Sequence, residues 1–293
     1  MFTQFFGSYL LNNGYVTGPQ LSKAIEEKNT VRMKLGVLAI NAGFMTSEQV
    51  ELVNIEQANR DMRFGDLAVD MGFVTAEQVD RLLSEQPSGH VLLGQALVND
   101  GALTNAQLEE AINDYKRTNQ LTDEDISDEQ NEKIALLVSE FYHFDSGEKA
   151  EVFTKYISLL IKNLIRFIGD DFIPLEAPIV TTYNSTKLVS QSFAGDAKGY
   201  TAIDADEATY KTLAERFAKE AITDSDYADA AIGEFLNLHN GLFTVNMSND
   251  LGKELTLTPQ SYDSAKELKF EKSAFCIPIR YNFGTANFII EIE

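Results

Sequence analysis

Two residues, Glu234 and Asn237, combine types and spacing that could do chemistry, and they lie in the segment AIGEFLNLHNG (residues 231–241). The apolar spacing of this segment predicts a helix, and a separation of three residues places both side chains on one helix face. A carboxylate beside a carboxamide can hold a water molecule and a cation together. The same spacing also fits a solvated helix face that ends at Asn240-Gly241, and spacing by itself leaves both interpretations open.

The segments around this pair predict an α+β domain with a mostly antiparallel sheet. Apolar periodicity predicts helices at residues 152–167, 206–220 and 226–238. Alternating and β-branched residues predict strands at residues 174–191, 200–203, 254–259, 273–281 and 286–292. Turns at residues 195–199 and 282–284 join neighbouring strands as hairpins. Strands that flank a pair of helices are typical of the α+β class.

The front of the chain, residues 1–117, repeats four times with a step of 29 residues. The repeat has two glycine columns and one threonine column: Gly7, Gly36, Gly65 and Gly94; Gly14, Gly43, Gly72 and Gly101; Thr17, Thr46, Thr75 and Thr104. Each threonine is followed three residues later by glutamine, which is typical of a capping box at a helix start. The second glycine can take the left-handed conformation that ends a helix. Each repeat is therefore predicted to be an all-α hairpin whose apolar faces are buried by stacked neighbours.

Charge marks the boundary between the two halves. Residues 118–151 contain ten acidic residues and two lysines, so we expect four helical repeats at residues 1–117, an acidic linker or linker helix at residues 118–150 and the α+β domain at residues 151–293. The net charge of the chain is −21. A chain this acidic repels phosphate backbones and anionic bilayers, which excludes nucleic acid and membrane surfaces as expected partners.

The cysteine, the histidines and the apolar segments limit the expected metal sites and the expected location of the protein. The one cysteine, Cys276, is predicted to be a buried strand residue. His90, His143 and His239 stand apart without the spacing of metal ligands, so we expect no metal site of the protein's own. The sequence has no segment typical of a signal peptide or a membrane span. These features predict a cytoplasmic protein.

The order of segments after residue 150 resembles the CheX and CheC family of chemotaxis phosphatases. The resemblance covers about residues 150–293 and includes the turn glycines, Glu234-Phe235-Leu236-Asn237, Asn240-Gly241, Pro259 and the closing Phe288-Ile289-Ile290-Glu291. It implies a CheX-like domain that removes phosphate from the aspartate of a CheY-like receiver domain. It also implies a homodimer through sheet or helix edges.

The resemblance assigns a role to each residue of the pair. Asn237 would position the attacking water, and Glu234 would engage a lysine of the receiver. An acyl phosphate is already activated and the receiver supplies Mg²⁺, so the reaction needs placement of water more than covalent catalysis, and the chain needs no cofactor of its own. The chain departs from the family pattern at Ala230, where many members have an acidic or hydroxyl residue, and Asp229 lies one place away.

The middle two repeats resemble the N-terminal domains of type II secretion and pilus ATPases, some of which, the MshEN type, bind cyclic di-GMP. The shared motif joins a basic residue, two glycines and a glutamine: Lys34, Gly36, Gly43 and Gln57, then Arg63, Gly65, Gly72 and Gln86. The resemblance implies that the basic side chain pairs with phosphate and that the backbone near the glycine approaches the ligand closely. Helical hairpins that only dock a protein explain the same repeats.

Two hypotheses of different class follow from these patterns. In the first, the protein is an aspartyl-phosphate phosphatase acting on a response regulator in chemotaxis or two-component signalling, with the repeats for regulation or docking. In the second, it is a non-catalytic signalling adaptor whose repeats bind cyclic di-GMP or a protein partner.

Overall fold

The computed structural model describes residues 2–84, 86–119, 131–143 and 148–293. The chain divides into two parts, which we call the helical unit (Phe2–Lys133) and the sheet unit (Ile134–Glu293). The fold class is as predicted, with helices in the first unit and an antiparallel sheet with helices in the second. None of the helices in the described ranges combines the length and the apolar character that a membrane crossing requires.

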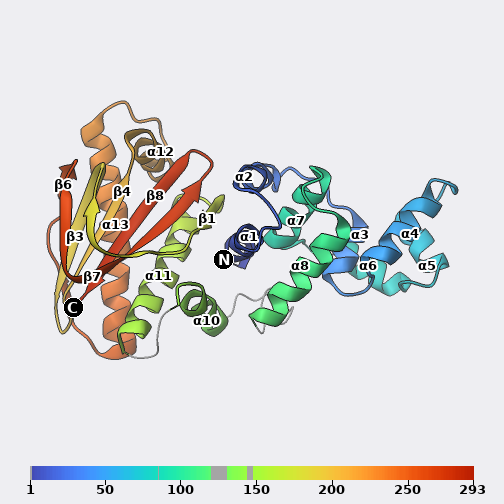
Figure 1. The fold of residues 1–293 in the computed structure, drawn as a ribbon, viewed down its shortest axis with the longest axis horizontal. Coiled ribbons are helices and arrows are strands. Elements are labelled where there is room, and N and C mark those ends of the chain that lie inside the picture. Colours follow the sequence, from blue (N-terminus) through green and yellow to red (C-terminus); the bar gives the residue numbers. More distant parts are fainter. Residues whose placement is uncertain (1, 85, 120–130, 144–147) are drawn as a thin grey trace. The chain divides into compact units, whose positions relative to one another are not determined.

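Helix pairs build the helical unit (Figure 1). They are α1 (Phe2–Asn12) with α2 (Gly18–Glu27), α3 (Leu35–Asn41) with α4 (Ser47–Gln57), α5 (Phe64–Asp70) with α6 (Ala76–Ser84), and α7 (Gly89–Asn99) with α8 (Asn105–Thr118). The predicted capping box is present at Thr46, which accepts from the backbone N–H of Gln49 and donates its own backbone N–H to the Gln49 side chain. The second glycine column has positive φ in every repeat. Both local signals are therefore confirmed.

The first repeat packs mainly against the last one. Helices α1 and α2 lie on α7, and Tyr9 of α1 donates a hydrogen bond to Asp114 and packs its ring near that of Tyr115. Lys23 of α2 forms an ion pair with Asp100. The 29-residue period does not reveal this order, because it describes the local structure of a repeat and not its partner.

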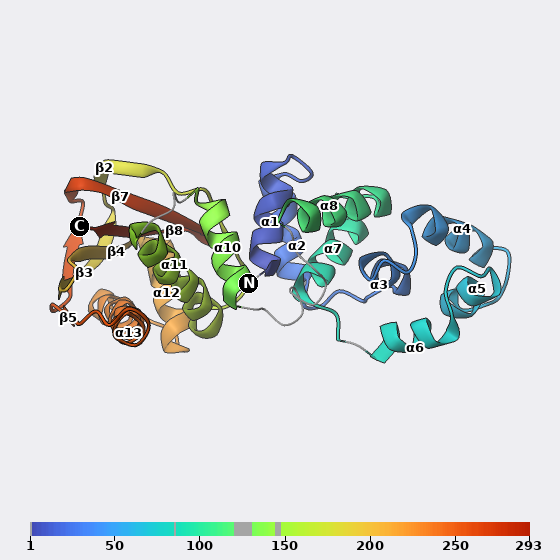
Figure 2. The same ribbon diagram turned by 90° about the horizontal axis from the view of Figure 1, so that it is seen from below.

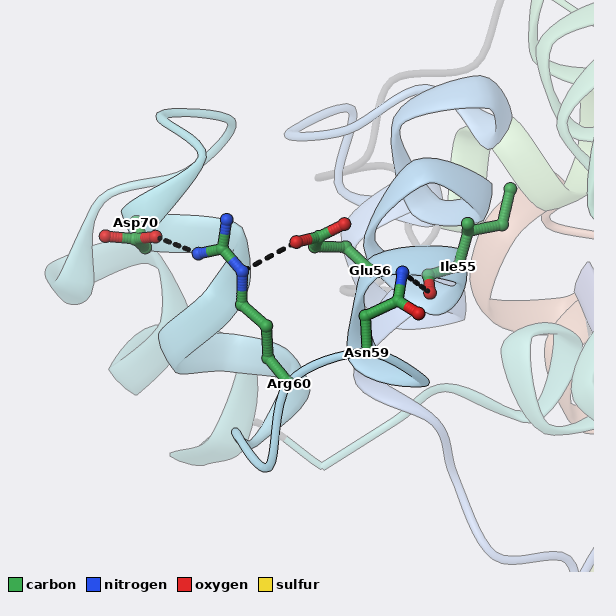
Figure 3. A network of polar contacts seen from close by, with 5 residues as sticks. All are labelled: Ile55, Glu56, Asn59, Arg60 and Asp70. Carbon is green, nitrogen blue, oxygen red and sulfur yellow. Dashed lines mark hydrogen bonds and ion pairs between the residues drawn. The ribbon is translucent and has the colours of Figure 1, made fainter.

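A polar cluster joins the second repeat to the third (Figure 3). Arg60, in the loop after α4, donates from Nε to Glu56 at 2.6 Å and from Nη1 to Asp70 of α5 at 3.0 Å. Asn59 donates from Nδ2 to the carbonyl oxygen of Ile55 at 3.4 Å. Exposed ion pairs of this kind contribute little to stability. They link the loop after α4 to the end of α5.

In the sheet unit, helices cover one face of an eight-stranded antiparallel sheet (Figure 2). The strands are β1 (Phe172–Pro174), β2 (Ile179–Asn184), β3 (Lys187–Gly195), β4 (Gly199–Ala205), β5 (Leu255–Leu257), β6 (Ser261–Ser264), β7 (Glu267–Tyr281) and β8 (Gly284–Ile292). Their order is β1-β7-β8-β4-β3-β5, while β2 also pairs with β7 and β6 with β3. The helices are α10 (Asn131–Phe141), α11 (Glu148–Phe167), α12 (Glu207–Ala218) and α13 (Ser225–Leu251). The predicted hairpins β3–β4 and β7–β8 are both present.

The long helix α13 crosses β3, β4 and β5 and carries the candidate site. Asp224 caps its start by accepting from the N–H of Asp226, and Gly252, with φ of 63°, ends it. The helix stop predicted at Asn240-Gly241 is wrong. The side chain of Asn240 is fully buried, and the helix continues because it buries Phe243 and Met247 beyond that point.

Candidate functional site

The structure places Glu234 and Asn237 together on α13. Glu234 is exposed and forms no hydrogen bond or ion pair with any residue in the described ranges. Asn237 is half-buried, and its Oδ1 accepts a hydrogen bond from Nε2 of Gln191 at 2.9 Å. The pair therefore offers an unpaired carboxylate to solvent beside an amide that is held from below.

Tyr262, on β6, lies next to the pair and was not foreseen from the sequence. Its hydroxyl lies so close to Gly233 that a Cβ there would come within 2.1 Å of it, so glycine lets the aromatic ring cross the helix. Partial burial raises the pKa of Tyr262, and the negative charges of Asp229 and Glu234 add to this effect. The ring remains 45% exposed. An accessible aromatic side chain thus borders the carboxylate.

Asp229, the acidic residue next to Ala230, has a partner of its own. Asp229 lies 3.3 Å from Nζ of Lys187, which also donates to the hydroxyl of Ser225. Ala230 is exposed. Of the two carboxylates Asp229 and Glu234, only Glu234 is left to pair with a visiting cation.

Behind the pair lies a set of buried side chains that sequence reasoning also missed. Gln191 on β3 is 2% exposed and contacts both Asn237 and Asn240 of α13. Its Nε2 also donates to the carbonyl oxygen of Thr258 at 2.9 Å. A glutamine inside a strand with buried neighbours is the one sequence signal that pointed here, because a buried amide needs partners.

His239 adds no titrating group near neutral pH. It is buried on α13, and burial lowers the pKa of its imidazole to about 3. Nδ1 lies within hydrogen-bond distance, 3.0 Å, of Nδ2 of Asn163. Among the described residues, no group of three or more histidine, cysteine, aspartate or glutamate side chains could hold a metal ion. Cys276 is buried, and burial raises the pKa of its thiol to about 11.

The helical unit contains a cavity of about 570 Å³ that brings together part of the second predicted residue set. Of that set, Lys34, Gly36 and Gln57 line the cavity, whereas the others do not: Gly43, Arg63, Gly65, Gly72 and Gln86. The remaining lining residues are Arg32, Met33, Leu35, Val37, Val50, Asn54, Phe64, Val98, Asn99 and Asn105. Helices of the second and fourth repeats therefore form most of its wall.

The lining of this cavity is suited to an anion. Among the described residues that line it, the charged ones are Arg32 and Lys34 and none is a carboxylate, although the chain carries a net charge of −21. Oδ1 of Asn105 is buried without a hydrogen-bond partner in the described structure, and since this oxygen only accepts, it would meet a donor group of a ligand and not its anionic group. Gly36 also has a packing role, because a Cβ there would lie 2.7 Å from Val50.

Comparison with known proteins finds a family model and several solved structures that match the sheet unit. Residues 188–280 match the model of a family described as Chemotaxis phosphatase CheX. Similar solved structures include a chemotaxis protein CheX from Desulfovibrio desulfuricans, with 15% identity over 49% of this chain and 99% of that chain and a TM-score of 0.44. No curated protein matches the sequence.

Two further structures have similar coverage. A CheC-like superfamily protein from Shewanella sp. PV-4 is 18% identical over 48% of this chain and 97% of that chain, with a TM-score of 0.42. A chain of the CheX–CheY–BeF₃–Mg²⁺ complex from Borrelia burgdorferi is 15% identical over 48% of this chain and 97% of that chain, with a TM-score of 0.39.

Proposed function

We propose that the CheX-like domain of the sheet unit hydrolyses the aspartyl phosphate of a CheY-like receiver domain. The family match at residues 188–280 includes both Glu234 and Asn237. The observation that carries the proposal is the arrangement of this pair, in which an exposed carboxylate without a partner among the described residues stands beside an amide held by a buried residue. Such an arrangement suits a surface that completes the active site of another protein.

In this mechanism the receiver brings the phosphoryl group and the Mg²⁺ that absorbs its charge. Glu234 pairs with a lysine of the receiver and thereby aligns the two proteins. Asn237 holds a water molecule in line with the bond between phosphorus and the aspartate oxygen. The water oxygen bonds to phosphorus, that P–O bond breaks, and inorganic phosphate and the free carboxylate result. Placement of the water supplies most of the acceleration.

The test is the rate of phosphate loss from receivers of the same organism, phosphorylated with a small acyl phosphate in the presence of Mg²⁺. We expect the full chain to accelerate this loss, and Asn237→Ala to reduce the acceleration about 100-fold because the water is no longer placed. Glu234→Gln should weaken the reaction by removing the charge that meets the receiver. No acceleration with any receiver would contradict the proposal.

Matched controls separate the site from general damage to α13. Asn246, on the same helix, and Glu271, on β7, are both exposed, so Asn246→Ala and Glu271→Gln should leave the rate unchanged. An Asn237→Ala variant as fast as an accelerating parent would show that Asn237 does not carry the reaction. A parent that binds a receiver without accelerating its phosphate loss would leave the non-catalytic adaptor as the better account.

We also propose a ligand for the helical unit, cyclic di-GMP, because the described lining of the cavity has two cationic side chains, Arg32 and Lys34, and no carboxylate. Calorimetry with the full chain should give a heat of binding. Lys34→Ala should lower the affinity about tenfold, since one charged phosphate contact is lost. Arg63 lies outside the cavity wall, so an effect of Arg63→Ala would show that the third repeat contributes. Arg60→Ala, which alters the loop cluster of Figure 3, is the control. Absence of heat would exclude this ligand.

A further inference from the structure

The polar side chains behind Asn237 form a chain of hydrogen bonds across the core of the sheet unit. Gln191 contacts Asn237 on one side and Asn240 on the other, at 2.9 and 2.8 Å. Asn240 in turn donates to the hydroxyl of Thr201 at 2.8 Å and accepts from that of Tyr156 at 3.3 Å. Gln191 and Asn240 are at most 2% exposed.

Backbone carbonyl groups fix the donor-to-acceptor direction of these hydrogen bonds, because a carbonyl oxygen only accepts. The carbonyl of Thr258 faces one amide end of Gln191, which must therefore be Nε2. The hydroxyl of Thr201 donates to the carbonyl of Gln191 at 2.8 Å, so it must accept from Nδ2 of Asn240. Nδ2 of Asn240 then also donates to Oε1 of Gln191. The backbone carbonyl groups of Thr258 and Gln191 therefore lead to one consistent orientation of the two side-chain amides, those of Gln191 and Asn240.

This orientation leaves Gln191 with one N–H to donate, and that N–H faces Asn237. Asn237 must present an acceptor to it, which is Oδ1. Nδ2 of Asn237 is consequently turned away from Gln191, and it has no hydrogen-bond partner among the described residues. The buried core thus decides which end of an accessible amide is free.

We propose that Gln191 is a positioning residue for the phosphatase reaction, holding Asn237 with Oδ1 inward and Nδ2 toward the attacking water. This inference rests on the proposed function. Nδ2 donates to one lone pair of the water, and the other lone pair bonds to phosphorus while the P–O bond to the aspartate breaks and a water proton passes to a phosphoryl oxygen. A free amide would populate both orientations, so fixing one of them increases the fraction of productive encounters.

The first test removes, at nearly constant shape, the donor that Gln191 presents to Asn237 and to the carbonyl oxygen of Thr258. Gln191→Glu can accept but cannot donate in its ionised form, so Asn237 is expected to turn its Nδ2 inward. We expect kcat to fall about 10- to 100-fold, the range for residues that orient a functional side chain, with KM for the phosphorylated receiver unchanged because Gln191 is buried. Gln260→Glu is the matched control, since Gln260 contacts the carbonyl of Gly233 and not Asn237.

Gln191→Met covers the case in which a buried carboxylate prevents folding, because methionine keeps the length and removes the donor. Thermal unfolding of each full-length variant identifies the folded ones. In the Asn237→Ala background, Gln191→Met should cause no further loss of rate, since a positioning residue acts only through the residue it orients. A folded Gln191→Met protein with unchanged kcat, or an equal loss in both backgrounds, would overturn the inference.

Asn237→Asp tests the orientation itself. Aspartate keeps an acceptor toward Gln191 and removes only the outward donor, so stability should be retained and kcat should fall as far as in Asn237→Ala. An Asn237→Asp protein that is fully active would overturn the proposed role of Nδ2. A parent chain that accelerates phosphate loss from no receiver would instead contradict the proposed function. Hydrogen exchange of the Gln191 side-chain amide would then still test its hydrogen bonds: protection supports them and rapid exchange contradicts them.

Discussion

The second and third repeats of the helical unit pack through an apolar cluster, whereas the sheet unit places a hydrogen-bonded group of amide side chains in its core. In the helical unit a glycine of the first column packs under a branched side chain of the next helix, as Gly36 does under Val50 and Gly65 under Val79, and the cluster around them is apolar. In the sheet unit Gln191 and Asn240 are buried and hydrogen-bonded to each other.

The difference shows two uses of a core. Repeated apolar packing produces the same hairpin several times, and its polar groups are then free to line a cavity. A buried polar network is costly if any member lacks a partner, but it fixes the orientation of a side chain at the surface. The candidate catalytic amide depends on the second kind of core.

The largest effect that would sharpen this comparison is expected from Asn240→Leu. The change removes hydrogen bonds to Gln191, Thr201 and Tyr156 and leaves buried polar atoms without partners. We expect the sheet unit to lose about 3 kcal/mol of unfolding free energy. Asn246→Leu, at an exposed position of the same helix, should change it by no more than about 0.5 kcal/mol. Chemical denaturation of the full chain measures both, and equal losses would contradict the role of the network.

A smaller effect is expected from Gly36→Ala in the helical unit. The added methyl group would lie 2.7 Å from Val50 and 3.3 Å from the ring of Phe64, so we expect a loss of about 1–3 kcal/mol from overpacking. Gly241→Ala is the counterpart in α13, where a Cβ meets nothing within 4 Å, and it should add about 0.5–1 kcal/mol because alanine favours the helix. Hydrogen exchange resolved by unit would locate each change, and a stabilised Gly36→Ala protein would break the packing argument.

At neutral pH the smallest effect is expected from His239, whose contribution to stability changes only below pH 6.5. Burial lowers the pKa of its imidazole from 6.5 to about 3, so between these pH values the imidazole is protonated in the unfolded state and neutral in the folded state. The contribution of His239 is fully present above pH 6.5 and falls by about 1.4 kcal/mol per pH unit below it. His239→Gln, which can still accept from Asn163, should remove this slope between pH 6.5 and 4. Parallel stability curves for parent and variant would show that the imidazole is accessible when folded.

Much of the fold followed from local sequence signals. The capping threonines, the positive-φ glycines and the hairpin turns depend on residues a few positions apart, and the structure contains them as predicted. The end of α13 was misplaced because Asn240-Gly241 has the local form of a helix stop, while its actual role is set by burial against the strands. Tertiary burial outweighs a local preference of this size.

The sequence alone determined the repeat, its caps and the shared helix face of Glu234 and Asn237, since backbone geometry relates residues three or four apart directly. Only the tertiary structure decided that Gln191 and Tyr262 surround that pair and that Arg32 and Lys34 face one cavity. These contacts join strands and helices that are distant along the chain, and a hydrogen bond of that kind exists only after the core has brought both partners together and excluded water from them.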